Sequence, residues 1–170
     1  MKLTSVVAIV RALNHAEVRY LVVGGLAVSA HGYLRYTKDV DLVVQLAPAN
    51  VERAFAALGA LGYRPTVPVT GAEFADAELR QSWIRDKGMV VLSFWSDAHQ
   101  ETPVDLFVTE PFPFDEEHAQ AVVKHLHGAG PVPFVTIPTL IRLKEAANRS
   151  EDRTDIAYLR QRLEDDGRPD

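Results

Sequence analysis

The chain alternates between segments with a helical spacing of apolar residues and shorter segments with the period of a β-strand. In the first half, Thr4 or Ser5 caps an expected helix that ends before Val18, and Asn50 is the expected N-cap of a later helix. The further helices expected in this half cover residues 26–31, 51–61 and 72–85, and the strands cover residues 19–23, 39–46 and 63–69. Two prolines in the last of these strands predict an edge position in the sheet.

The second half of the chain predicts a hairpin, one more strand and a pair of terminal helices. The expected strands cover residues 89–95, 104–108 and 132–137, and the expected helices cover residues 115–126, 138–147 and 152–163. We therefore predict an α/β or α+β fold with a mixed central sheet flanked by helices and a C-terminal helical pair. Residues 1–137 would form the core, and residues 138–170 would pack on it within a single domain.

Composition narrows the class of protein. The 170 residues are 47% hydrophobic and 24% charged, as in ordinary globular domains. No apolar run approaches the ~18 residues that span a bilayer, so we expect a cytoplasmic protein without a membrane partner. The chain has no cysteine, which excludes disulfides and thiolate metal sites. The net charge of −5 argues against duplex DNA as a partner.

Two carboxylates, Asp39 and Asp41, interrupt an apolar run. On a strand their side chains would point to one face. Two like charges at such a short distance destabilise the fold unless a cation neutralises them. Mg²⁺ is commonly held by one or two carboxylates together with substrate phosphates. Upstream, Gly24 and Gly25 lie between an apolar strand and a short helix, where backbone N–H groups can approach a phosphate. This pattern predicts metal-dependent phosphate chemistry.

A third acidic residue fits the same chemistry. Two-metal phosphoryl transfer uses a further group that helps to activate the attacking hydroxyl. Asp105 lies in the otherwise apolar strand at residues 104–108, where an unpaired carboxylate would be costly. Asp97 and Glu101 belong to the polar hairpin tip and are expected to be solvated.

The whole arrangement resembles the nucleotidyltransferase superfamily. The features that carry the resemblance are an apolar strand, Gly24-Gly25, a short helix, Arg35-x-Thr37-x-Asp39-x-Asp41 and a later strand with one more aspartate. That superfamily includes DNA polymerase beta and the aminoglycoside and lincosamide nucleotidyltransferases, and the closer similarity is to the prokaryotic branch related to AbiEii-type toxins. Residues 140–159 are similar to the family's C-terminal helices, so the resemblance covers roughly residues 18 to 160.

The resemblance implies roles for particular residues. Gly24 and Gly25 would form the phosphate-binding turn, although the family often has serine at the second position. Asp39, Asp41 and Asp105 would hold two Mg²⁺ ions, and Asp105 would act on the acceptor hydroxyl. Lys144 would face the nucleotide phosphates.

The basic residues near the acids leave alternatives open. Arg35 and Lys38 either contact phosphate or neutralise the nearby aspartates. Arg149, Asp152 and Asp155 are expected to form charge pairs that join the last two helices.

The expected reaction transfers a nucleoside monophosphate from an NTP to an acceptor hydroxyl. The sequence leaves the acceptor open between a small molecule, a protein and a tRNA, and it leaves open a role as a toxin–antitoxin component. It also leaves open a protein partner or a homo-oligomer. The alternative is a catalytically silent binding module of the same fold, against which the retention of all three acids argues.

Overall fold

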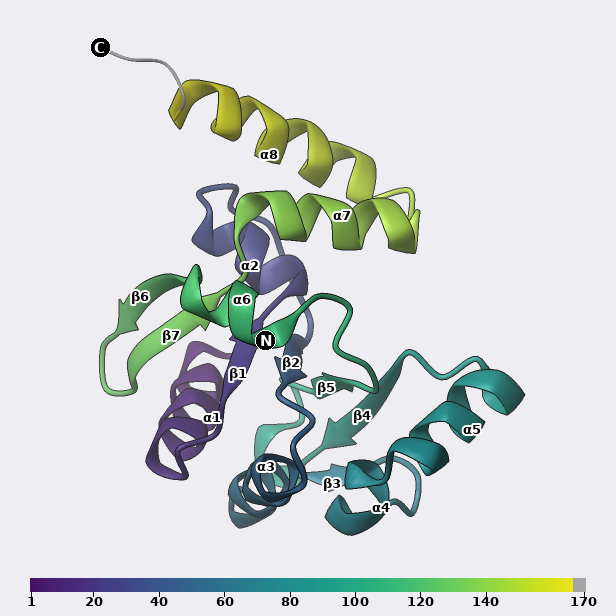
Figure 1. The fold of residues 1–170 in the computed structure, drawn as a ribbon. Helices are drawn as coiled ribbons and strands as arrows, with labels where there is room; N and C mark the ends of the chain where they lie inside the picture. Colours follow the sequence, from purple (N-terminus) through teal and green to yellow (C-terminus); the bar gives the residue numbers. More distant parts are fainter. Residues whose placement is uncertain (167–170) are drawn as a thin grey trace.

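A seven-stranded mixed sheet forms the centre of the molecule (Figure 1). The computed structural model describes residues 1–166. The strand order is β3-β4-β5-β2-β1-β7-β6. The strands are β1 (Tyr20–Val22), β2 (Val40–Val44), β3 (Arg64–Pro65), β4 (Val91–Trp95), β5 (Val104–Phe107), β6 (Val122–Leu126) and β7 (Gly130–Phe134). Strands β2 and β5 run parallel, as do β1 and β7, whereas the other neighbouring pairs are antiparallel, so the predicted mixed sheet is confirmed.

Helices pack around this sheet. They are α1 (Leu3–His15), α2 (Gly24–Ala30), α3 (Pro48–Ala60), α4 (Gly71–Ala75), α5 (Ala77–Lys87), α6 (Phe114–Ala119), α7 (Ile137–Ala147) and α8 (Asp152–Asp166), with a 3₁₀ turn at Asp97–His99. Helix α3 covers one face of the sheet, where the ring of Phe55 packs edge-on against Phe94 of β4 at 5.1 Å. Leu92 and Leu106 on the same face are at most 1% exposed, so the main core lies on this side.

The opposite face of β2, β5 and β4 is less covered. Strand residues alternate between faces, and β5 shows this as a buried, half-buried, buried, half-buried pattern. The register places Asp41 beside Asp105 and Asp105 beside Ser93. These three residues are only half-buried, so this face leaves room for a site.

The predicted helix at residues 115–126 is wrong in its second half. Helix α6 ends at Ala119, and the chain continues as β6, which pairs with β7 from Val122 opposite Phe134 to Leu126 opposite Gly130. Gly128 and Gly130 have φ values of +82° and +92° and allow the tight reversal between the two strands. Pairing with a neighbouring strand therefore overrides the helical spacing of this segment.

Three predicted details of the helices also need correction. Helix α1 begins at Leu3 with Lys2 as its N-cap, so neither Thr4 nor Ser5 caps it. The expected helix at residues 72–85 is divided, because the Asp76 side chain accepts hydrogen bonds from the first N–H groups of α5 and so begins a new helix. Asn50 is not an N-cap: α3 begins earlier, at Pro48, a residue favoured in the first turn. Asn50 is instead buried, and its side chain exchanges two hydrogen bonds with the backbone of Arg19.

The predicted C-terminal pair of helices is confirmed by α7 and α8, which lie side by side above α2 (Figure 1). Thr136 caps α7 by accepting a hydrogen bond from the Thr139 N–H. The last residues of the assigned C-terminal segment, 167–170, lie outside the described residues. Within residues 1–166, no helix has the length and apolar character needed to cross a membrane.

Candidate active site

Three aspartates meet at the half-buried face of the sheet. Asp41 on β2 lies directly beside Asp105 on the parallel strand β5. Asp39 comes two residues before Asp41 and therefore projects to the same side. One carboxylate oxygen of each residue lies within 4.8 Å of the other two. The structure thus brings together the three acids that the sequence singled out.

The electrostatics of this triad favour a bound cation. Burial, and then the charges of Asp39 and Asp105, raise the pKa of Asp41 from its ordinary value of 3.8 to about 7. Arg149 and Lys144 act in the opposite direction. Burial also raises the pKa of Asp105, while a hydrogen bond with the Ser93 side chain opposes this. Three crowded carboxylates, among them two with a raised pKa, suit a divalent cation with a preference for oxygen, such as Mg²⁺.

Gly24 lies against Asp41 and Gly25 against Thr37, so neither position has room for a side chain. Gly24 has φ of +64°, and a Cβ atom there would lie 1.9 Å from Asp41 Oδ2. A Cβ atom on Gly25 would lie 2.8 Å from Thr37 Oγ1. The sequence predicted a turn followed by a helix from Leu26, but the glycines themselves form the first turn of α2. The opening N–H groups of α2, which have no partner within the helix, therefore lie next to Asp41.

A buried ion-pair network joins the two terminal helices. Lys144 of α7 is 6% exposed, and its Nζ lies 2.8 Å from an Asp152 oxygen and 2.6 Å from an Asp155 oxygen. The predicted charge pairing between these helices is confirmed for Asp152 and Asp155, whose side-chain partner is Lys144. Arg149 donates its backbone N–H to Asp152. Contact of Lys144 with a nucleotide phosphate stays a prediction.

The remaining basic residues of the sequence motif differ in their surroundings. The Arg35 guanidinium pairs with Asp155, so the same acid contacts Arg35 and Lys144. Arg35 Nε also lies 3.5 Å from the position of a Cβ atom on Gly25, which places this side chain beside the glycine turn. Lys38 is exposed, and it forms no ion pair with the side chains described, those of residues 1–165.

Sequence reasoning missed Ser93. This residue lies on β4 opposite Asp105, and its side chain hydrogen-bonds the Asp105 carboxylate. The available signal was its place between Leu92 and Phe94, because a polar residue in an alternating strand marks the face away from the core. Thr37 is a second supporting residue, since its hydroxyl lies 3.3 Å from Asp39 Oδ1.

The sequence matches no protein-family model and no curated protein. Solved structures nevertheless match across most of the chain. The antibiotic-resistance factor ANT(2'')-Ia matches with a TM-score of 0.59 at 13% identity, over 95% of this chain and 83% of that one. The lincosamide antibiotic adenylyltransferase LnuA, bound to lincomycin, matches with a TM-score of 0.56 at 12% identity, over 86% of this chain and 89% of that one.

A third match is an antigenic nucleotidyltransferase-like protein from Paracoccidioides brasiliensis, with a TM-score of 0.57 at 16% identity. It covers 95% of this chain and 75% of that one. At these identities the similarity concerns the fold. The chain therefore has the nucleotidyltransferase fold, and the triad of Asp39, Asp41 and Asp105 is consistent with a nucleotidyltransferase catalytic site.

Proposed function

We propose that this protein is a metal-dependent nucleotidyltransferase that transfers a nucleoside monophosphate from an NTP to an acceptor hydroxyl. One observation carries the proposal: three carboxylates converge within 4.8 Å on the half-buried face of a sheet with the nucleotidyltransferase fold. In a domain with a purely structural role, three neighbouring carboxylates would only lower the stability of the fold. Their mutual repulsion becomes useful only when a cation and its phosphate ligands are bound.

Asp39, Asp41 and Asp105 would hold two Mg²⁺ ions. When bound, these ions would neutralise the negative charge of the triphosphate and of the pentavalent transition state. The parallel pairing of β2 and β5 fixes the carboxylates of Asp41 and Asp105 in advance, so that little reorganisation accompanies binding.

The glycine turn would orient the triphosphate. The N–H groups of Gly24 and Gly25 open helix α2 next to Asp41, where no side chain obstructs the approach of a phosphate. Arg35 beside this turn would add a fixed positive charge, held in place by its ion pair with Asp155. Lys38, which is exposed at the entrance to β2, would contribute only through its charge. Lys144 would reach the phosphates only if it released one of its two acid partners.

Asp105 would accept the proton of the acceptor hydroxyl. The hydroxyl oxygen forms a bond to the α-phosphorus, the bond from that phosphorus to the bridging oxygen breaks, and pyrophosphate leaves with the electron pair. Burial raises the pKa of Asp105, which makes its carboxylate a better base than an exposed aspartate. The hydrogen bond with Ser93 would keep the carboxylate oriented toward the acceptor.

The acceptor would be a small hydroxylated molecule. ANT(2'')-Ia has been seen with adenylyl-2''-tobramycin and LnuA with lincomycin, so this fold carries small-molecule chemistry in both relatives. The half-buried face beside Asp105 continues along the sheet over Phe107 and Val91, which would contact an apolar part of the acceptor. A protein or tRNA acceptor, as in a toxin–antitoxin pair, rests on the sequence resemblance alone.

Thermal unfolding with each NTP tests the nucleotide site. Mg²⁺ together with at least one NTP should raise the melting temperature, and EDTA should remove the effect, because a ligand that binds only the folded state stabilises it. The shift should disappear in Asp39→Asn and persist in Asp86→Asn, which changes an exposed aspartate on α5. A shift that is equal in all three proteins would place the nucleotide elsewhere.

Pyrophosphate release tests turnover. The protein should release pyrophosphate from the stabilising NTP when a panel of hydroxylated acceptors is added, and Asp105→Asn should lower the rate by at least about 10²-fold. Magnesium-dependent NTP binding without turnover on small molecules, proteins or tRNA would refute the transferase and favour the silent binding module.

A further inference from the structure

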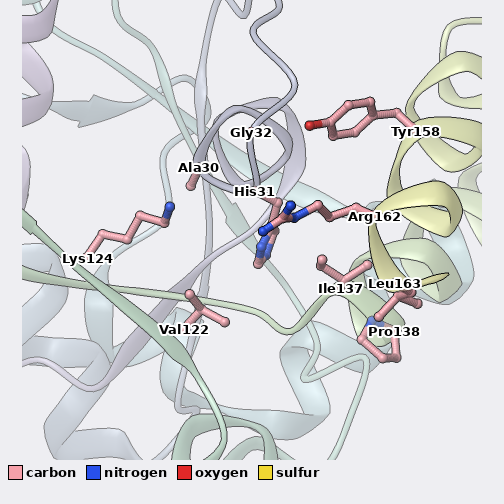
Figure 2. A pocket seen from close by; sticks show the side chains of 10 residues that line it. All are labelled: Ala30, His31, Gly32, Val122, Lys124, Ile137, Pro138, Tyr158, Arg162 and Leu163. Atoms are coloured by element: carbon pink, nitrogen blue, oxygen red, sulfur yellow. The ribbon is translucent and has the colours of Figure 1, made fainter. Parts of the chain in front are cut away.

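A cavity between α2, β6, α7 and α8 lies apart from the triad (Figure 2). Its volume is about 550 Å³, and none of its described lining residues belongs to the triad or to the glycine turn. A molecule confined to this cavity would not touch Asp105, which accepts the proton in the proposed reaction. The contacts of an acceptor therefore have to lie on the face of the sheet that carries Asp105.

Trp95 lies on the same face of the sheet as Asp105. Side chains alternate along β4, and Leu92 and Phe94 are buried on the core side. Ser93 and Trp95 therefore face the other way, and Ser93 is the cross-strand partner of Asp105. Two residues beyond Ser93, Trp95 is the diagonal neighbour of Asp105. The Cα atoms of such a pair are ~7–8 Å apart, which is within the reach of an aromatic side chain.

The indole of Trp95 is open to a ligand, since this side chain is 44% exposed. Its cross-strand partner is Arg64 of β3, whose guanidinium carbon lies 5.6 Å from the centroid of the ring. Arg64 also pairs with Asp97 at 3.6 Å, and both of these side chains are exposed. A guanidinium next to an indole extends its flat surface. We call this pair the Trp95–Arg64 platform.

The platform lies on the side of the triad opposite to the glycine turn. The strand order is β3-β4-β5-β2-β1 across this part of the sheet, with the triad on β5 and at β2. The glycine turn follows β1, whereas the platform belongs to β3 and β4. A triphosphate held by the first N–H groups of α2 would approach the triad from the β1 side. The β4 side is then left for the acceptor.

We propose that the Trp95–Arg64 platform holds a flat aromatic ring of the acceptor. This inference rests on the proposed transferase function, and it narrows the acceptor class to hydroxylated small molecules that carry such a ring. With the ring on Trp95, a hydroxyl group of the same molecule lies at the Asp105 carboxylate. Stacking on an aromatic side chain is favourable for planar rings in general, so the platform selects for the ring and tolerates different substituents.

Phe107 and Val91 do not compete with this assignment. They pair with each other one step along the sheet, on the other side of the pair formed by Asp105 and Ser93. Both are half-buried, whereas Trp95 is exposed. The acceptor would therefore contact the sheet on both sides of Asp105, with its ring at the more open position.

The indole N–H signals of the two tryptophans make binding visible without turnover. Trp83 packs on Phe74 with ring centroids 6.4 Å apart and serves as the internal control, and Trp83→Phe assigns the two signals. We would titrate the ¹⁵N-labelled protein, with Mg²⁺ and without NTP, with phenyl β-D-glucopyranoside and with methyl β-D-glucopyranoside. These two compounds share their hydroxyl groups and differ in the aromatic ring.

The phenyl compound should shift the Trp95 signal saturably, with a dissociation constant at or below ~10 mM. The methyl compound should bind at least about fivefold more weakly, because it cannot stack. Trp95→Ala should weaken binding of the phenyl compound by at least about fivefold, whereas Trp95→Phe should retain most of it and Trp83→Phe all of it. An unshifted Trp95 signal, a shift that is larger at Trp83, or equal affinities for the two compounds would each overturn the proposal. The comparison of the two compounds uses the wild-type protein and does not depend on a variant that folds.

The melting-temperature shift with Mg²⁺ and NTP separates this proposal from the proposed function. It should be the same in Trp95→Ala as in the wild type, because the platform lies on the acceptor side. Loss of the shift in Trp95→Ala alone would assign the platform to the base of the nucleotide and overturn the proposal. A failed titration with an intact NTP shift would refute the platform and leave the transferase standing. An absent NTP shift in the wild type would refute the transferase, and the assignment of an acceptor with it.

Discussion

Replacing Asp41 with asparagine should abolish transfer and, at the same time, stabilise the metal-free protein. Burial and the charges of Asp39 and Asp105 raise the pKa of Asp41 from 3.8 to about 7. Between these two pH values the folded chain holds a proton at this carboxyl that the unfolded chain has released. The stability of the wild-type protein therefore falls as the pH rises from about 4 to about 7, and it stays low at higher pH.

The magnitude follows from the difference between about 7 and 3.8, which is about 3 pKa units. At ~1.36 kcal/mol per unit, ionised Asp41 lowers the free energy of unfolding by about 4 kcal/mol above pH 7 and by less than about 1 kcal/mol near pH 4. Asparagine has the same shape without the charge, so Asp41→Asn should recover most of this difference at high pH and little at low pH.

Urea unfolding followed by circular dichroism in EDTA measures the effect. Asp41→Asn should exceed the wild type by several kcal/mol at about pH 8 and by about 1 kcal/mol or less at about pH 4. Asp86→Asn, which changes an exposed residue, should match the wild type at both pH values. A gain of equal size at the two pH values, or no gain at about pH 8, would refute the electrostatic reasoning.

Three further substitutions test the surroundings of the triad. Gly24→Ala should lower the activity, and it should lower the free energy of unfolding in urea by about 1–3 kcal/mol, because φ is +64° and the new Cβ would lie 1.9 Å from the Asp41 carboxylate. Gly59→Ala is the control: its Cβ has open space around it, so the substitution should be neutral or stabilising by up to about 1 kcal/mol. Lys144→Met should lower the free energy of unfolding by about 3–5 kcal/mol, because it removes the cation between two buried acids, of which only Asp155 keeps its pair with Arg35. Lys2→Met, from an exposed ion pair, should change the free energy of unfolding by less than about 0.5 kcal/mol. Ser93→Ala should move the acidic limb of the pH–rate profile to higher pH, because it removes the hydrogen bond that lowers the pKa of Asp105, the proposed general base.

The convergence of the acids was predictable because it rests on short-range rules. Two residues two apart on a strand share a face, and this alone joins Asp39 to Asp41. Asp105 was identifiable because an acid in an apolar strand needs a partner or a cation. Its pairing beside Asp41 required the parallel alignment of β2 and β5, which no local pattern encodes.

The helix expected at residues 115–126 failed for a related reason. Its first turns formed α6, but the segment from Val122 to Leu126 pairs with β7, from Val122 opposite Phe134 to Leu126 opposite Gly130. Its apolar residues suit either a helix or a strand. The turn at Gly128 and Gly130 and the available edge of β7 favour the strand. Tertiary pairing of this kind lies outside the reach of periodicity.

The ion pairs show most clearly where sequence reasoning stops. The charges at residues 144–155 predicted that two helices are joined, and they are. The sequence did not indicate that Asp155 also reaches Arg35, which is 120 residues earlier and lies beside the glycine turn. That contact makes the terminal helices part of the candidate site. Because a buried acid shared by two cations is costly to separate from either, any movement of α8 must carry Arg35 with it or leave a charge unpaired.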